Sequence, residues 1–246
     1  MPKVILIDDE PLARSIVREY LAAFPELEVV AECNDGFEGV KAIQQFQPDL
    51  LFLDIQMPRI NGFEMLELLT NPPLVIFTTA FDEFAMKAFE THAIDYLLKP
   101  FSPERFARAI EKWKAAAQSA EPGPTTALLE TASQSPLQRH RVVVRTGQKI
   151  RIIPVADIHY FEAADDFVKL HTSEGVFLKN RTLTYFENLL DKGQFARCHR
   201  SYLINIQQIT RIDHHEKDSY VAVLISGAVI PVSRTGYVRL KEVLGL

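Results

Sequence analysis

The chain of 246 residues has few cysteines and no long apolar run. Its two cysteines, Cys33 and Cys198, lie in opposite halves, and two thiols are too few for a disulfide framework. We expect both to be buried, reduced thiols, with a redox switch as the alternative. No apolar stretch approaches the roughly 20 residues that span a bilayer, and no charged and then apolar leader opens the chain. The sequence therefore predicts a cytoplasmic protein without a membrane span.

Motifs of the common enzyme classes are also missing. We find no nucleotide-binding glycine-rich loop, no nucleophile elbow and no zinc-ligand spacing. Internal repeats and a helix-turn-helix pattern are absent as well. A free-standing enzyme therefore has little support. The hydrophobic content of 47% is enough for real cores, and the length predicts one or two domains.

The first half of the chain alternates apolar strands with helical segments. The expected helices lie at residues 12–24, 36–46, 62–70, 83–90 and 103–114. This alternation is typical of a doubly wound α/β domain, whose parallel sheet is covered by helices on both faces. We place this domain at residues 1–116.

The pattern changes after a stretch of small, polar and proline-containing residues, which we interpret as a flexible linker at 117–136. Short β-branched and aromatic runs with turn residues between them then predict a mostly β domain at 137–246. Two helices interrupt it, at 182–191 and 236–244. The expected strands lie at residues 141–146, 149–154, 158–162, 167–172, 176–179, 202–204, 208–212, 220–225 and 228–232.

Charge separates the two domains further. Residues 1–116 carry 11 Lys and Arg against 19 Asp and Glu, whereas residues 137–246 carry 16 against 11. Six of the seven histidines also lie in the second domain. A basic domain beside an acidic one is expected for a protein that binds a polyanion. A solvated basic face is the alternative explanation.

Acidic and basic residues follow three of the apolar strands in the first domain. Asp8 and Asp9, Asp54, and Lys99 each come directly after such a strand. Because the carboxyl ends of parallel strands meet at one crevice, we expect these side chains to lie together. Clustered acids require a cation or raised pKa values, and Mg²⁺ is the simplest cation for oxygen ligands.

Each of these segments also has a local explanation. An acidic pair before a proline can begin a helix. A Lys-Pro pair can form a turn with a cis peptide bond, and Asn61-Gly62 is typical of a loop. None of these explanations requires the four segments to occur together.

Residues 1–114 resemble the response-regulator receiver domains of two-component signalling. The resemblance rests on Asp8-Asp9, Asp54-Ile55-Gln56-Met57-Pro58, Asn61-Gly62, Thr78-Thr79-Ala80, Tyr96 and Lys99-Pro100-Phe101. It implies that Asp54 accepts a phosphoryl group from a histidine kinase. It also implies that Asp9, Asp54 and the backbone carbonyl of Gln56 bind Mg²⁺ directly, with Asp8 acting directly or through water.

The resemblance assigns roles to three further residues. Thr79 hydrogen-bonds a phosphoryl oxygen, Lys99 bridges the phosphoryl group to the acids, and the ring of Tyr96 turns inward as a switch. Phosphoryl transfer depends mostly on positioning and on neutralising charge. We therefore expect the chain to promote only its own phosphorylation and dephosphorylation.

The second domain is similar to the LytTR family, mostly β DNA-binding domains that end LytR/AlgR-type response regulators. The resemblance covers about residues 139–246. It rests on residues 158–168 (IHYFEAADDFV), 195–205 (FARCHRSYLIN) and 230–234 (IPVSR). Members of this family insert loops into successive major grooves, which implies that double-stranded DNA is the partner.

By position, the resemblance places several residues at the DNA: Asp166, Phe167, Lys169, His199, Arg200 and Arg234. An arginine can offer a bidentate fork to guanine, which suits Arg200 and Arg234. Lys169, Lys179 and Arg181 are better suited to phosphate contacts. His199 has an alternative structural role, in which it fixes the turn before Ser201. Likewise, we expect Asn205 to cap a turn rather than to touch DNA.

The sequence thus predicts a cytoplasmic response regulator that binds DNA and is switched by phosphorylation of Asp54. The alternative is a phosphorylation-controlled interaction protein whose β domain binds a protein or RNA. We expect phosphorylation to promote a homodimer that favours repeated DNA sites. Exchanged ion pairs would support the dimer, with apolar help from Phe106 or Phe84. The candidates for these pairs are Glu83, Asp95, Arg105, Arg108 and Lys112.

Overall fold

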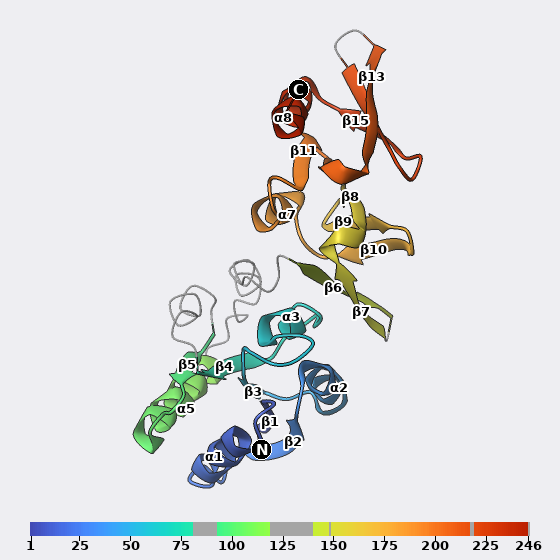
Figure 1. Ribbon diagram of the computed structural model, residues 1–246. Coiled ribbons are helices and arrows are strands. Elements are labelled where there is room, and N and C mark those ends of the chain that lie inside the picture. Colours follow the sequence, from blue (N-terminus) through green and yellow to red (C-terminus); the bar gives the residue numbers. More distant parts are fainter. Residues whose placement is uncertain (81–92, 119–139, 148, 217–218, 246) are drawn as a thin grey trace. The chain divides into compact units, whose positions relative to one another are not determined.

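The computed structural model describes residues 1–80, 93–118, 140–147, 149–216 and 219–245. It divides into two compact units, Met1–Ala132 and Ser133–Leu246, which are drawn in Figure 1. Most of the predicted linker lies outside the described residues, as do Phe84, Glu83 and the helix expected at 83–90. Within the described ranges, no helix is long and apolar enough to cross a membrane.

The first unit is the predicted α/β domain. In chain order it contains β1 (Lys3–Ile7), α1 (Pro11–Leu21), β2 (Glu28–Cys33), α2 (Gly36–Phe46), β3 (Leu50–Leu53), α3 (Gly62–Leu66), β4 (Leu74–Thr79), β5 (Asp95–Leu98) and α5 (Pro103–Gln118). The strands form one sheet in the order β2-β1-β3-β4-β5, and every pair is parallel. The predicted doubly wound parallel sheet is confirmed.

Helices lie on both faces of this sheet (Figure 1). Alternate residues of a strand point to opposite faces, and both faces are apolar here because β3 is buried throughout and β1 is buried from Val4 to Ile7. On one face, Leu6 and Phe52 join a core with α1 and α5. On the other, Ile7 and Met65 lie against Gly39 of α2. Burial on both faces explains why these strands are continuous apolar runs.

The second unit is mostly β, as predicted. Its elements are β6 (Arg141–Thr146), β7 (Lys149–Pro154), η4 (Val155–Asp157), β8 (Ile158–Ala164), β9 (Phe167–Thr172), β10 (Gly175–Lys179), α7 (Leu183–Leu189), β11 (Phe195–His199), β12 (Tyr202–Asn205), η5 (Ile206–Gln208), β13 (Ile209–Glu216), β14 (Ser219–Leu224), β15 (Val229–Val232) and α8 (Arg234–Leu244). The predicted strands are present with small shifts of their ends. The strand β11 was not predicted.

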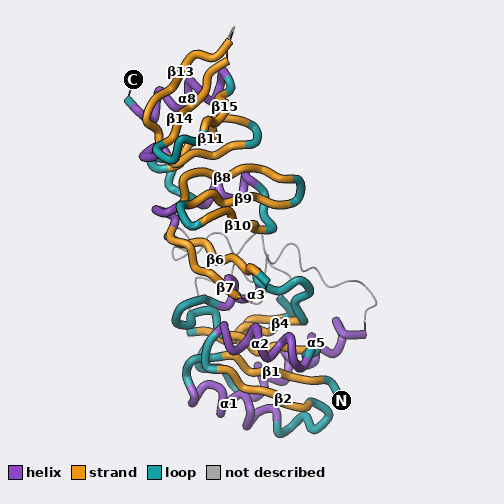
Figure 2. Tube along the Cα trace, turned by 90° about the vertical axis from the view of Figure 1, so that its right-hand side faces the viewer, coloured by secondary structure: helices purple, strands orange, loops and turns teal. Residues whose placement is uncertain are grey.

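Three antiparallel sheets build this unit, as Figure 2 shows in orange. Five strands run in the order β10-β9-β8-β12-β11, three form β13-β14-β15, and β6 pairs with β7. One core joins β6 and β7 to α7 and the inner face of the five-stranded sheet, around Phe161 and Phe186. A second core joins β11 and β12 to the three-stranded sheet and α8, around Cys198 and Leu240.

Candidate phosphorylation site and nucleic-acid interface

The acidic site lies at the carboxyl ends of β1 and β3. The backbone N–H of Asp54 donates to the carbonyl of Ile7 at 2.8 Å, and that of Asp8 donates to Cys33 at 3.1 Å. These bonds extend the sheet by one residue and fix both acids at its edge. The two residues are only 3% and 6% exposed, for Asp8 and Asp54 respectively.

Lys99 brings the end of β5 into the same site. Its Nζ lies 2.7 Å from Oδ2 of Asp8 and 3.4 Å from Oδ2 of Asp54. Glu10 also approaches, at 3.7 Å, although its side chain is largely exposed. The peptide bond between Lys99 and Pro100 is cis, as the sequence allowed. The acids and the lysine predicted to meet at the strand ends do meet.

The three charges perturb one another because water is largely excluded. Burial raises the pKa of Asp54 to about 6, the nearby Asp8 adds to the rise, and Lys99 opposes it. Burial raises the pKa of Asp8 too, against its hydrogen bond from Lys99. Burial would lower the pKa of Lys99, but its contacts with Asp8 and Asp54 outweigh that effect and raise it. One lysine therefore does not satisfy the acids of the site.

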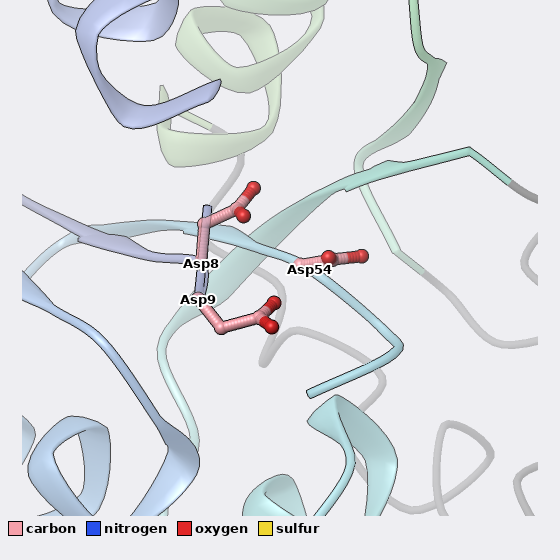
Figure 3. Close-up of side chains that lie close together, drawn as sticks. All are labelled: Asp8, Asp9 and Asp54. Carbon is pink, nitrogen blue, oxygen red and sulfur yellow. The ribbon is translucent and has the colours of Figure 1, made fainter. Parts of the chain in front are cut away.

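A divalent cation fits this donor set. Carboxylate oxygens of Asp8, Asp9 and Asp54 all lie within 4.8 Å of one another, and Figure 3 shows the three side chains side by side. Asp9 is partly exposed, so an ion can reach the group from solvent. Magnesium prefers oxygen ligands and keeps several waters. The backbone N–H of Gln56 donates to Oδ1 of Asp54 at 3.3 Å, which places this loop at the site.

Thr79 supplies an unsatisfied hydroxyl at the end of β4. Thr79 is fully buried, and its Oγ1 has no hydrogen-bond partner among the described residues. A buried hydroxyl without a partner costs about 1–3 kcal/mol, so a group that accepts its proton would stabilise the site. The backbone N–H of Lys99 donates to the Thr79 carbonyl at 2.7 Å. Tyr96, the predicted switch, is buried in β5 at 6% exposure.

The loop after Asp54 is held by tight backbone packing. A Cβ at Gly62 would lie 2.4 Å from the carbonyl oxygen of Asp54, so only glycine fits. The next helix begins with a capping box. Oδ1 of Asn61 accepts from the N–H of Glu64, and Oε2 of Glu64 accepts from the N–H of Asn61, both at 2.8 Å. The sequence predicted a helix from residue 62 but not its cap, although an acid three residues after Asn61 is typical of this cap.

The predicted dimer contacts need correction. Asp95 is buried and already paired within the chain, with Arg105 at 2.6 and 2.9 Å and with Lys112 at 2.9 Å. It therefore does not offer a carboxylate to a second copy. Phe106 is fully buried, with its ring stacked on Phe52 at 5.1 Å. It belongs to the core and cannot supply apolar contact between subunits.

The second unit gathers the predicted DNA contacts at one end of its five-stranded sheet. Asp166 and Phe167 lie at the turn from β8 to β9, and Arg200 lies at the turn from β11 to β12. These two turns are neighbours, because the N–H of Ala163 donates to the Ser201 carbonyl at 2.9 Å. The start of α8, which carries Arg234, is joined to β11 by a bond from Ser233 N–H to Cys198. Segments far apart in sequence thus form one edge.

Several side chains of this edge are open to solvent. Asp166, Arg200 and Arg234 are exposed, and Phe167 is 43% exposed. Lys169 is half-buried, with its Nζ 3.6 Å from Glu162. A pocket of about 450 Å³ opens beside Arg200. It is lined by Glu187, Arg197, His199, Arg200, Ser233, Thr235 and Arg239.

Two polar residues make the structural contacts that were the alternative to DNA contact. Nδ1 of His199 accepts from the N–H of Ser201 at 3.2 Å, so this ring fixes the turn. Asn205 is buried and accepts from the N–H of Gln207 at 3.1 Å. The predicted turn cap at Asn205 is confirmed. DNA contact by His199 stays a prediction.

The phosphate contact predicted for Lys179 disagrees with its position. The residue is 7% exposed, and its Nζ donates to the Val143 carbonyl at 2.7 Å. The strand β10 turns this side chain towards β6, so its ammonium group is a structural donor. Arg181 differs from Lys179, because its half-buried guanidinium lies over the ring of Tyr185 at 4.9 Å.

An acidic crevice at the ends of parallel strands, joined in one chain to a basic β domain, defines a receiver coupled to a DNA-binding module. Family models agree with this class. Residues 4–111 match the response regulator receiver domain, and residues 148–245 match the LytTr DNA-binding domain.

Two relatives are similar over the whole chain. Sensory transduction protein LytT of Bacillus cereus is 33% identical, covering 99% of both chains. Transcriptional regulatory protein BtsR of Escherichia coli is 36% identical, covering 100% of both. A solved LytTr DNA-binding domain from Bacillus cereus is 27% identical over 44% of this chain and 98% of its own, with a TM-score of 0.41.

The chain belongs to the response regulators that combine a receiver with a LytTR domain. It is a DNA-binding transcriptional response regulator of a two-component system, whose partners are a histidine kinase and DNA. The alternative of a protein-binding or RNA-binding module is not favoured.

Proposed function

We propose that Asp54 accepts the phosphoryl group. The observation that carries this proposal is the placement of a buried carboxylate beside Lys99 and near Asp8 and Asp9. A carboxylate can act as a nucleophile towards phosphorus. Burial raises the pKa of Asp54 to about 6, so positive charge beside it favours the anion that attacks phosphorus. Lys99 provides part of that charge, and the Thr79 hydroxyl donates to a phosphoryl oxygen.

Magnesium would complete the neutralisation. Asp9, Asp54 and the Gln56 carbonyl would hold the ion, with Asp8 binding directly or through water. When bound, Mg²⁺ supplies positive charge to the phosphoryl oxygens. The protein itself positions Asp54, excludes water from the buried acids and places Lys99. It promotes its own phosphorylation and dephosphorylation, not the turnover of a separate substrate.

Intact-mass spectrometry after incubation with a small acyl-phosphate donor and Mg²⁺ tests this assignment. We expect one added phosphoryl group on the wild type and none on Asp54→Asn. Asp9→Ala should slow labelling and raise the Mg²⁺ concentration that it requires. Asp49→Asn is a matched control, since that carboxylate caps Lys3 at the other end of the sheet. Full labelling of Asp54→Asn would show that another residue is the acceptor.

We further infer that the edge formed by Asp166, Phe167, Lys169, Arg200 and Arg234 enters the grooves of double-stranded DNA, with His199 and Arg181 beside it. Arginine forks at base edges give sequence preference, whereas phosphate contacts only position the domain. Selection of duplexes from a random pool, followed by binding at several salt concentrations, tests this inference. Binding that ignores both duplex sequence and salt would contradict it.

The remaining expectations are part of the same proposal. The protein acts in the cytoplasm, and the linker at 117–136 connects the two domains. Phosphorylation favours a homodimer, which raises the local concentration of a second DNA-binding domain. Tyr96 transmits the change by moving towards the space that Thr79 vacates. Sedimentation with and without an acyl-phosphate mimic tests the dimer, and an unchanged monomer with normal activation would exclude it.

A further inference from the structure

Arg197, a residue that the sequence analysis did not single out, bonds to the turn that presents Arg200. Its Nε donates to the carbonyl of His199 at 3.0 Å, and its Nη2 donates to the carbonyl of Arg200 at 2.5 Å. One guanidinium group therefore holds two successive carbonyls at the turn between β11 and β12. The side chain is only 18% exposed, so the group is largely committed to these bonds.

Glu187 of α7 fixes this guanidinium from the other side. Its Oε2 accepts from Nη1 of Arg197 at 2.9 Å, and its Oε1 lies 3.4 Å from Nη1 of Arg239 in α8. The carboxylate is about one-third exposed. Because an arginine presents its donors in a rigid plane, anchoring one end of that plane orients the other end. The two helices therefore set the direction in which Arg197 faces the turn.

Other bonds hold the backbone beside these carbonyls, and His199 pairs with Tyr202 across the hairpin. The His199 ring accepts from Ser201 N–H, and the Ser201 carbonyl accepts from Ala163. Neither bond involves the carbonyl of Arg200, the residue whose exposed side chain is proposed to contact DNA. A group held in its bound conformation before binding loses less entropy when the complex forms. The bonds of Arg197 restrain His199 and Arg200, and so reduce the entropy that this turn would lose on binding DNA.

We propose that Arg197 and Glu187 form a positioning pair that orients Arg200 for base reading without touching DNA themselves. This inference rests on the proposed contact between Arg200 and DNA. It predicts that Glu187, an acid at a basic interface, favours selective binding even though its charge repels phosphate.

The direction in which Glu187→Ala changes DNA affinity separates this proposal from simple electrostatics. Glu187→Ala removes a negative charge, and electrostatics alone predicts tighter binding to every duplex. The positioning pair predicts instead that binding to a selected duplex weakens by about 5- to 10-fold, because the fork of Arg200 is worth that much or more. Binding to a scrambled duplex should stay the same or tighten, so the ratio of the two affinities falls.

Two further variants sharpen the comparison. Glu187→Gln keeps an oxygen that can accept from Arg197, so it should retain more selectivity than Glu187→Ala, although both lose the same charge. Asp213→Ala is the matched control, because Asp213 also pairs with an arginine, Arg211 at 2.9 Å, but has no bond to the turn. It should leave the affinity ratio unchanged. Titration with duplex to stoichiometry corrects each variant for any unfolded fraction.

A double-substitution cycle in the full-length protein completes the test. Arg200→Ala should lower the affinity ratio in the wild type and lower it much less in Glu187→Ala, because the second background has already lost the orientation. If Arg200→Ala has no effect in the wild type, the proposed DNA contact and this inference both fail. If it acts equally in both backgrounds, or if Glu187→Ala keeps the wild-type ratio, only the positioning pair is wrong.

Discussion

Gly236 is the position where the smallest substitution should do the most damage to DNA binding. It lies in the first turn of α8, against the carbonyl group of Cys198 in β11. A Cβ at this position would lie 1.8 Å from that oxygen and 2.4 Å from its carbon. Ordinary contact begins near 3.4 Å, so Gly236→Ala must move helix and strand apart. The atoms in the way are backbone, which cannot rotate aside as a side chain does.

The cost follows from the bonds at this contact. The Cys198 carbonyl accepts from the N–H and from the hydroxyl of Ser233, at 2.9 and 3.2 Å. Losing both costs about 2 kcal/mol, and overpacking a tight contact adds about 1–3 kcal/mol. Alanine returns about 1 kcal/mol through its better helix propensity. We therefore expect a net loss of about 2–4 kcal/mol, which corresponds to a fall in melting temperature of roughly 10–20 °C.

Circular dichroism of the full chain during heating measures this loss. The single tryptophan, Trp113, lies in the receiver. Its fluorescence therefore reports on unfolding of the receiver, which Gly236→Ala should not change. Val238→Ala, at a residue of the same helix that is 65% exposed, is the control and should be nearly neutral. A Gly236→Ala protein that melts and binds DNA like the wild type would refute the reasoning.

Three further substitutions have expected results. Asp95→Asn should cost about 2 kcal/mol, less than the roughly 3–5 kcal/mol of a fully buried pair, because Arg105 and Lys112 can reach water. Burial alone would raise the pKa of Asp95, but its bonds to Arg105 and Lys112 lower it. The stability difference between wild type and variant, measured by urea unfolding, should therefore hold at neutral pH and shrink below about pH 4; a difference independent of pH would contradict this. Arg234→Ala should change the base preference in DNA binding. Lys179→Ala should lower stability but leave the salt dependence of DNA affinity unchanged. A slope of log affinity against log salt reduced by about one unit would show that Lys179 does contact a phosphate.

The receiver could be predicted closely because its strands are buried on both faces. The apolar runs at β1 and β3 admit one interpretation, and the acids after them define the crevice. The ends of helices were harder. The helix expected at residues 62–70 ends at Leu66, because an amphipathic pattern continues into turns that no longer keep helical hydrogen bonds.

In the β domain, several features depend on partners elsewhere in the chain and could not be predicted from local residue types. The strand β11 (FARCH) has no β-branched residue, and only Phe195 is of a type enriched in strands, so β propensity gave a weak signal. Lys179 was assigned to the surface because lysine is seldom buried. The register of β10 on β9 decides its direction instead, and register is set by partners elsewhere in the chain. Arg197 was missed for the same reason, since its role lies in contacts with α7.

The distribution of cysteines turns the protein into a reporter of its own local opening. Each domain carries one buried thiol, Cys33 in β2 and Cys198 in β11. Burial raises the pKa of both to about 12, so neither reacts at neutral pH until its surroundings open. Pulsed alkylation followed by peptide mapping would therefore yield two separate opening free energies from one sample. At Cys198 the measured event is the opening of the core that β11 shares with α8 and the three-stranded sheet, and bound duplex should slow it.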